Sequence, residues 1–145
     1  VESGGSVMNS QSAPPPGYAE TKLADPFEIY VGPVFHEGEL GTRRFAFRVD
    51  VRHVNMRGIL HGGMLMTFAD LSLGQAVWDL TANAPCVTLN MQTQFLKPAK
   101  AGDLVEVAPE LVRRTRALLF MRGDFKVGKE IIFTAAGVWK LLGVD

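Results

Sequence analysis

One long segment, residues 62–80, is apolar at almost every position. Its apolar residues recur at helical spacing and leave almost no polar face, which predicts a helix that is buried on nearly every side. One face of a flat sheet covers only one side of such a helix. The segment therefore predicts an α+β architecture, in which a sheet curls around a single helix.

The segments on both sides of this helix carry strand signals. Apolar and polar residues alternate in 43–54 and in 87–95, which is typical of half-buried strands and places Thr88 on the polar face, opposite Met91. Gly128 and Lys129 predict a hairpin turn. Further strand candidates are residues 27–35, 104–112, 117–127 and 131–142. We expect two strands, the helix and then four strands.

Composition predicts one domain that is preceded by a flexible arm. A chain of 145 residues suits a single core. Residues 1–24 are small, polar and proline-rich, so we expect an extended arm there and a folded domain over 25–145. Met8 is a candidate native start, in which case residues 1–7 precede the natural protein.

Charge and cysteine content exclude several classes of function. Fifteen Lys and Arg balance fifteen Asp and Glu, which argues against nucleic-acid binding driven by net charge. The single cysteine, Cys86, cannot form an internal disulfide, and the start of the chain lacks a leader-like apolar run, so we expect a cytoplasmic protein. Asp70 interrupts the apolar segment and argues against a membrane span. No spacing typical of a metal site occurs, so we expect no metal.

One stripe of the predicted helix is small and polar. Gly63, Thr67, Asp70 and Gly74 lie four, three and four residues apart, so they share a face. The neighbours of Asp70 are otherwise apolar, which favours a functional carboxylate over a solvated surface acid. A groove with a carboxylate at its centre suits general-base or nucleophilic chemistry.

Gly62 and Gly63 open this helix. Backbone N–H groups at a helix N-terminus are unpaired, so they can stabilise negative charge on a carbonyl oxygen, and glycine permits close approach of a ligand. Asp70 lies eight residues beyond Gly62, which is about 12 Å along a helix. Both groups reach one carbonyl carbon only if they come from different subunits. This constraint predicts a dimer with two composite sites.

The segment from Asn55 to Gly63 (NMRGILHGG), followed by Asp70, resembles the N-x-x-G-x-x-H-G-G-x(6)-D pattern of hotdog-fold thioesterases of the phenylacetate-pathway and thioesterase-superfamily-member-2 type. Residues 88–103 (TLNMQTQFLKPAKAGD) are similar to a strand and a P-A-x-x-G-D turn of that family. The resemblance covers roughly residues 31–142. It implies a hotdog fold, in which a curved antiparallel sheet wraps one long helix. It also implies hydrolysis of acyl-CoA thioesters to a free carboxylic acid and CoA.

The resemblance implies a role for each matching residue. Gly62 gives its N–H to the oxyanion contact, and Asp70 of the partner chain acts as nucleophile or general base. Asn55 and His61 orient the loop and the thioester end, and Thr88 helps to hold the attacking water.

Each matching residue also has a structural alternative. His61 suits a helix cap, Asn55 the stabilisation of its own turn, and Thr88 an ordinary strand position. Gly62 and Gly63 suit a tight turn into the helix. His36 and His53 lack partners in the sequence pattern and are expected at the surface or in turns.

Gly63, Thr67, Lys97 and Arg113 are the candidate substrate-binding residues. The first two belong to the helix and its groove. The two basic residues are candidates for contact with the phosphates of CoA, because the resemblance implies that the turn after Phe95 lies near the ligand mouth. Solvated surface charge is the alternative for both. CoA is here part of the substrate, and no separate cofactor is expected. The resemblance also implies a homodimer that assembles as a dimer of dimers.

Two other functions stay open. Hotdog hydratases and dehydratases resemble a different pattern, in which a catalytic His precedes an aromatic, Pro and Gly, or Asp and His are paired, whereas two glycines follow His61 here. A non-catalytic domain that binds or senses acyl-CoA is the other alternative, against which Asp70 argues.

Overall fold

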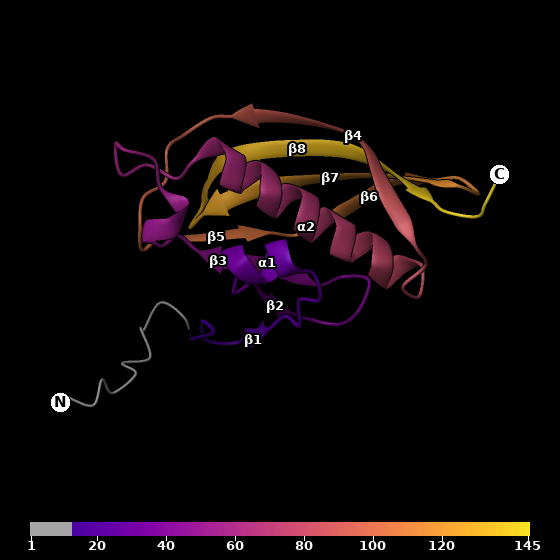
Figure 1. The fold of residues 1–145 in the computed structure, drawn as a ribbon, viewed down its shortest axis with the longest axis horizontal. Coiled ribbons are helices and arrows are strands. Elements are labelled where there is room, and N and C mark those ends of the chain that lie inside the picture. The colour runs from indigo at the N-terminus through magenta and orange to yellow at the C-terminus, as the bar shows by residue number, and fades with distance from the viewer. Residues whose placement is uncertain (1–12) are drawn as a thin grey trace.

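The structure, a computed structural model, describes residues 13–145. An antiparallel sheet of eight strands curves around one long helix, α2 (Gly62–Leu80), which crosses its inner face (Figure 1). This arrangement confirms the expected α+β hotdog fold. The predicted start at Met8 lies outside the described residues. No helix within 13–145 is long and apolar enough to cross a membrane.

The strands pair in the order β1-β2-β3-β5-β7-β8-β4, and β6 also pairs with β7. A short helix, α1 (Pro26–Val31), lies between β1 and β2, and a 3-10 turn, η1 (Val51–His53), lies between β3 and α2. Because β4 ends the order, one of its edges faces away from the sheet. The strands are β1 (Ala19–Glu20), β2 (Phe35–Glu37), β3 (Arg44–Arg48), β4 (Cys86–Phe95), β5 (Leu104–Val107), β6 (Glu110–Arg114), β7 (Leu118–Val127) and β8 (Glu130–Leu141).

The prediction of a strand over residues 27–35 is wrong for most of its length, because α1 forms there. The Asp25 side chain caps this helix and accepts a 2.7 Å hydrogen bond from the Glu28 N–H. Pro26 occupies the first helical turn, where its missing N–H costs nothing. These start signals override the β-forming residues that follow them.

Two further strand predictions are too long. The strand over 43–54 stops at Arg48 and gives way to η1, which is capped by Asp50. The strand over 104–112 is divided into β5 and β6. Pro109 lies at the break, where a proline cannot donate to the ladder.

The chain joins the sheet earlier than predicted. The Tyr18 hydroxyl donates to Glu106 at 2.6 Å, β1 pairs with β2, and Thr21 is buried. Leu23 packs against the core. The predicted arm over residues 1–24 is therefore wrong for 18–23, which belong to the folded body.

Aromatic contacts fix α2 on the sheet. The ring of Phe68, on α2, lies 4.6 Å from that of Phe47 on β3 and 5.7 Å from that of Phe125 on β7. Near the end of α2, Asp79 accepts two hydrogen bonds of 2.7 Å from Arg43. Both halves of the helix are thereby held, which fixes the face that it turns away from the sheet.

That outward face is more open than predicted. The helix begins and ends where the sequence indicates, but Met66 and Trp78 are 40% and 37% exposed, and Asp70 between them is exposed as well. The expectation of burial on nearly every side is therefore wrong for a single chain.

A bulge in β4 changes which of its side chains face α2. The pairing with β8 shifts between Thr88 and Asn90, so one extra residue stands in this strand. Strict alternation places Thr88 opposite Met91, whereas the structure has both lining one hollow beside α2. Gly137 of β8 lies against the bulge, since a Cβ there would stand 2.7 Å from the Asn90 carbonyl oxygen.

We predict that Gly137→Ala lowers the free energy of unfolding by about 2–3 kcal/mol, because the added methyl group overpacks against backbone and the Trp139 ring. Gly74→Ala is the matched control. A Cβ at Gly74 meets only the Trp139 ring nitrogen, at 3.5 Å, so this variant should gain about 0.5–1 kcal/mol from helix propensity. Urea denaturation measures both. Equal stability of the two variants would contradict this account of the bulge.

Candidate active site

Asp70 lies in the middle of the open face of α2, and Thr88 reaches it from β4. The Thr88 hydroxyl donates to Asp70 Oδ1 at 2.6 Å. Within residues 13–145, Asp70 Oδ2 accepts no hydrogen bond. The carboxylate is therefore held through one oxygen, and the other is open to a water or substrate. The Thr88 oxygen keeps its lone pairs as acceptors for a further water.

Three hollows follow this face of α2. The middle one, of 420 Å³, is lined by Thr67, Asp70 and Thr88 and is closed on one side by α1; we call it the Asp70 cavity. A hollow of 130 Å³ continues from Asp70 past Gly74. One of 380 Å³ extends to Gly63 at the other end. The predicted stripe of small and polar residues is thus open along its length.

Glu28 of α1 lines the Asp70 cavity together with Asp70 of α2 and Thr88 of β4. Burial raises the pKa of Glu28 to about 7, and the negative charge of Asp25, a hydrogen bond with Asp25 and the negative charge of Asp70 add to this effect. Glu28 is therefore protonated in a large share of molecules at neutral pH. The cavity holds a titrating acid beside Asp70.

The turn η1 holds α1 in place. The Arg52 guanidinium donates to backbone carbonyls at the C-terminal end of α1, and His53 Nε2 donates to the Val31 carbonyl at 2.7 Å. His53 Nδ1 accepts from the Asp50 N–H at 3.1 Å, which identifies the neutral Nε2–H tautomer. His53 is 3% exposed, so the expectation that it lies at the surface is wrong.

His61 is the N-cap of α2. Its Nδ1 accepts from the Gly63 N–H at 2.8 Å, and its own N–H donates to the His53 carbonyl. In the described part of the chain, the Gly62 N–H makes no hydrogen bond. Gly62 also lies under the ring of Phe95, since a Cβ there would stand 2.9 Å from that ring. The helix thus begins with a capped amide at Gly63 and a free amide at Gly62.

Asn55 shapes the turn that leads into α2. Its Oδ1 accepts from the N–H groups of Arg57 and Ile59 at 2.9 and 3.2 Å, and its own N–H donates to the Ile59 carbonyl. The side chain is used within its own turn, as the structural alternative expects. Its link to the site is indirect, through the path of the backbone toward His61.

The two candidate basic residues lie apart from these hollows. Lys97 forms a 2.9 Å ion pair with Glu130 in the segment that follows β4. Arg113 is exposed on β6, next to Arg114, which donates to the carbonyl of Leu80 at the C-terminal end of α2. Neither basic residue lines any of the three hollows along α2.

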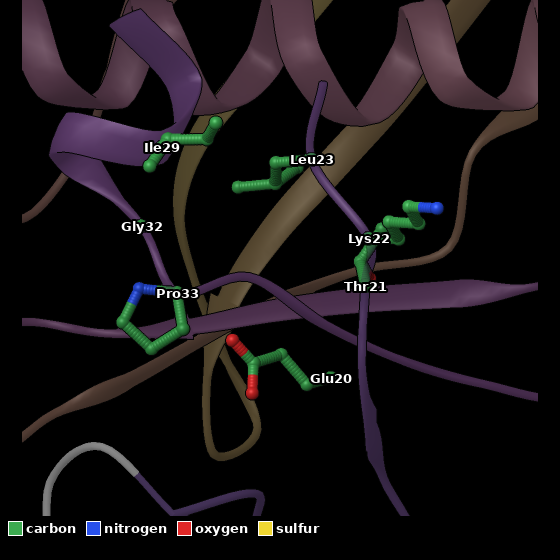
Figure 2. A pocket seen from close by; sticks show the side chains of 7 residues that line it. All are labelled: Glu20, Thr21, Lys22, Leu23, Ile29, Gly32 and Pro33. Carbon is green, nitrogen blue, oxygen red and sulfur yellow. The ribbon is translucent and has the colours of Figure 1, made fainter. Parts of the chain in front are cut away.

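A larger hollow, of 700 Å³, lies away from α2 (Figure 2). It is bounded by residues 20–23 on one side and by Ile29, Gly32 and Pro33 on the other. No predicted site residue lines it. We therefore place the candidate active site along α2 rather than here.

Glu28 was not found from the sequence, because the β-forming residues of 27–35 favour a strand, and Arg52 was missed because residues 43–54 were predicted as one strand. A signal was present: Asp25 and Pro26 form a cap and first-turn pair of the kind that starts a helix. A short helix at that place puts Glu28 within reach of the functional face of α2.

Comparison with known proteins identifies relatives of this chain. The sequence profile of the Thioesterase superfamily matches residues 57–133. The Pseudomonas aeruginosa protein PA0474 is 29% identical over 129 residues, which are 88% of this chain and 96% of that protein. Mouse acyl-coenzyme A thioesterase 13 is 29% identical over 77 residues, 53% of this chain and 55% of the mouse protein. This match spans about half the length of the mouse enzyme.

Solved structures share the fold. A mutant of the phenylacetic acid degradation protein PaaI from Thermus thermophilus superposes with a TM-score of 0.73 at 24% identity, covering 81% of this chain and all of that one. A hypothetical thioesterase from Streptococcus pneumoniae, solved with coenzyme A, has a TM-score of 0.70 at 24% identity, over 77% of this chain and 90% of that one. Because the family profile covers more than half of the sequence, and the fold agrees with it, this protein belongs to the thioesterase superfamily.

Proposed function

We propose that this protein hydrolyses acyl-CoA thioesters to a free carboxylic acid and CoA. The observation that supports this most directly is the 2.6 Å hydrogen bond that holds Asp70 in an open cavity on α2. The acyl-CoA substrate is suggested by the name of the mouse relative and by the coenzyme A in the pneumococcal structure.

Asp70 supplies the base in the proposed reaction. Its free oxygen takes a proton from a water that also contacts the Thr88 hydroxyl, and the water oxygen attacks the thioester carbonyl carbon. The C–S bond then breaks, and the CoA sulfur leaves and receives a proton. Direct attack by Asp70 on the same carbon, followed by hydrolysis of the anhydride, is the alternative course. Both courses need an ionised carboxylate and neither needs a metal or a separate cofactor.

The free N–H of Gly62 is the proposed oxyanion donor. It carries the partial positive charge of a helix N-terminus, and it has no competing acceptor in the described part of the chain. His61 acts as a positioning residue, because its ring caps the adjacent Gly63 N–H. Asn55 supports the same loop from its own turn.

A homodimer is proposed because Gly62 and Asp70 of one chain are about 12 Å apart along α2. The outer edge of β4 suits the seam between two subunits: it ends the sheet, and an unpaired edge favours pairing with a second strand. Val87, Leu89 and Phe95 on this strand are 42%, 56% and 55% exposed. Association of two such edges places one subunit's α2 beside its partner's and buries this apolar surface. A dimer of dimers remains a prediction.

The substrate contacts follow from the same placement. Gly63 and Thr67 line the open face and form the walls beside the thioester. Lys97 follows the strand that carries Phe95 over Gly62, so we propose it, ahead of Arg113, for the phosphates of CoA.

The two alternatives have less support. Hotdog hydratases resemble a different pattern around the catalytic histidine, whereas Gly62 and Gly63 follow His61 here and its Nδ1 caps α2. In a domain that only binds acyl-CoA, there is no function for the Asp70 carboxylate, which is held by the Thr88 hydroxyl through one oxygen and leaves its other oxygen free.

We predict that Asp70→Asn lowers kcat for thiol release from acyl-CoA by about 10²–10⁴-fold, because the amide cannot take a proton from water. Thr88→Val should lower kcat by roughly tenfold, the range of a lost hydrogen bond to a charged group, and Thr88→Ser should restore most of it. A thiol-reactive dye follows the release. Activity of Asp70→Asn equal to that of the unaltered protein would reject the proposed base.

For His61, substitution separates capping from proton transfer. We predict that His61→Asn keeps most activity, because asparagine is a strong N-cap, whereas His61→Ala loses about 1 kcal/mol of stability and several-fold in kcat. Thermal unfolding and thiol release measure the two effects. If His61→Asn is as inactive as His61→Ala while equally well folded, His61 takes part in the chemistry and not only in positioning.

A further inference from the structure

Two carboxyl groups that the proposed hydrolysis does not use face the Asp70 cavity. Asp25 and Glu28, both at the start of α1, line this cavity and also the 130 Å³ hollow that continues from it. Among the described residues that line these two hollows, none is a lysine or arginine. The described residues contain no group of side chains arranged to hold a metal ion. The excess negative charge therefore has no cation opposite it.

The rest of the cavity wall is apolar. Phe27 of α1, Met66 and Leu71 of α2, and Met91 of β4 surround the acids and the Thr88 hydroxyl. Such a wall accepts a hydrocarbon chain, and the flexible methionine side chains adapt to its shape. A volume of 420 Å³ lies within the range of small-molecule sites.

The charge of the cavity decides which end of an acyl-CoA enters it. CoA carries several phosphate charges, which need basic side chains or free backbone amides nearby. Asp25, Glu28 and Asp70 offer neither and repel an anion. With the thioester held at Asp70, the phosphate-bearing CoA portion must therefore extend away from this cavity. The acyl chain is then the part of the substrate that lies in it.

We propose, on the premise of the thioesterase function above, that the Asp70 cavity binds the acyl chain and that Asp25 and Glu28 select uncharged acyl groups over those that end in a carboxylate. The two acids act as specificity-determining residues and take no part in bond breaking.

The helix that carries both acids is held at both ends. Asp25 caps α1 through its 2.7 Å bond from the Glu28 N–H, and the far end of α1 is held by Arg52 and His53. Arg52 itself pairs with Asp50 at 2.8 Å and does not line the cavity. Its charge is thus already partnered and leaves the two acids of α1 uncompensated.

The selection should depend on pH because Glu28 titrates near neutrality. The pKa of Glu28 is raised to about 7, mainly by burial and then by Asp25 and Asp70. The other titratable group facing it is Cys86, whose thiol pKa is raised by burial. Below pH 7, Glu28 is neutral and repels an acyl carboxylate less. Above pH 7 it is ionised, and rejection of that carboxylate is stronger.

The test compares hexanoyl-CoA with adipoyl-CoA, which has the same six-carbon acyl chain with a terminal carboxylate. We expect the ratio of kcat/KM, hexanoyl over adipoyl, to be at least tenfold at pH 8 and to fall several-fold at pH 6, because one negative charge is then removed from the cavity wall. In Glu28→Gln the ratio should be roughly threefold lower at pH 8 and should no longer change with pH.

Two variants serve as controls. Asp25→Asn keeps the cap, since asparagine also accepts the Glu28 N–H, but removes a charge. It should lower the ratio and move the pH step to a lower value, because the Asp25 charge helps to raise the pKa of Glu28. Glu110→Gln, on β6 and paired with Arg122, removes a surface carboxylate elsewhere and should leave the ratio unchanged.

If Glu28→Gln leaves the hexanoyl-to-adipoyl ratio at pH 8 unchanged, the proposal is overturned. This holds whether the ratio itself is large or small. Failure of the thioesterase function is a separate outcome, in which neither ester releases thiol. Calorimetric binding of the two esters to the same variants then measures the same ratio. Tighter binding of hexanoyl-CoA that depends on Glu28 supports the selection even in that case, and equal binding rejects it.

Discussion

The structure depends on the packing of one helix that is apolar on all sides except a narrow stripe. The curved sheet covers most of α2, and the ring of Phe68 is fixed between aromatic rings of β3 and β7. The ion pair between Arg43 and Asp79 holds the other half. Because these contacts fix the rotation of α2 about its axis, they also fix Asp70 on the face that α2 turns away from the sheet. The polar stripe is the part of the helix that the sheet leaves for a ligand.

Two irregular elements, the bulge in β4 and the short helix α1, supply the other walls of the candidate site on α2. The bulge in β4 turns Thr88 toward Asp70, and it exists beside Gly137, where a side chain would collide with the bulged backbone. The short helix α1 forms another wall and brings Glu28 into the cavity. Neither element belongs to the regular repeat of strands and helices. Both are local departures from it at the place where chemistry is proposed, as expected where function competes with regular geometry.

The sequence predicted the regular parts and not these departures. The apolar run and the two glycines predicted α2 with its correct ends, and spacing alone placed Asp70 on the open stripe. The bulge was not predictable from alternation, because it depends on how β4 meets β8. The β-forming residues of α1 were interpreted as a strand, since their preference is weaker than the cap at Asp25. The burial of His53 depends on α1 and was missed with it.

The central claim is that Gly62 of one subunit and Asp70 of its partner act on one thioester. Subunit mixing tests it most directly, with Asp70→Asn and Gly62→Pro. The proline removes the amide hydrogen at the first helical position, where its backbone is tolerated, and the outer end of the Phe95 ring must shift to admit it. Each variant alone should be nearly inactive. After unfolding and refolding an equal mixture, half of the dimers are mixed and each has one intact site, so about a quarter of the original activity should return. No recovery, although mixed dimers are present by native mass spectrometry, would contradict the account.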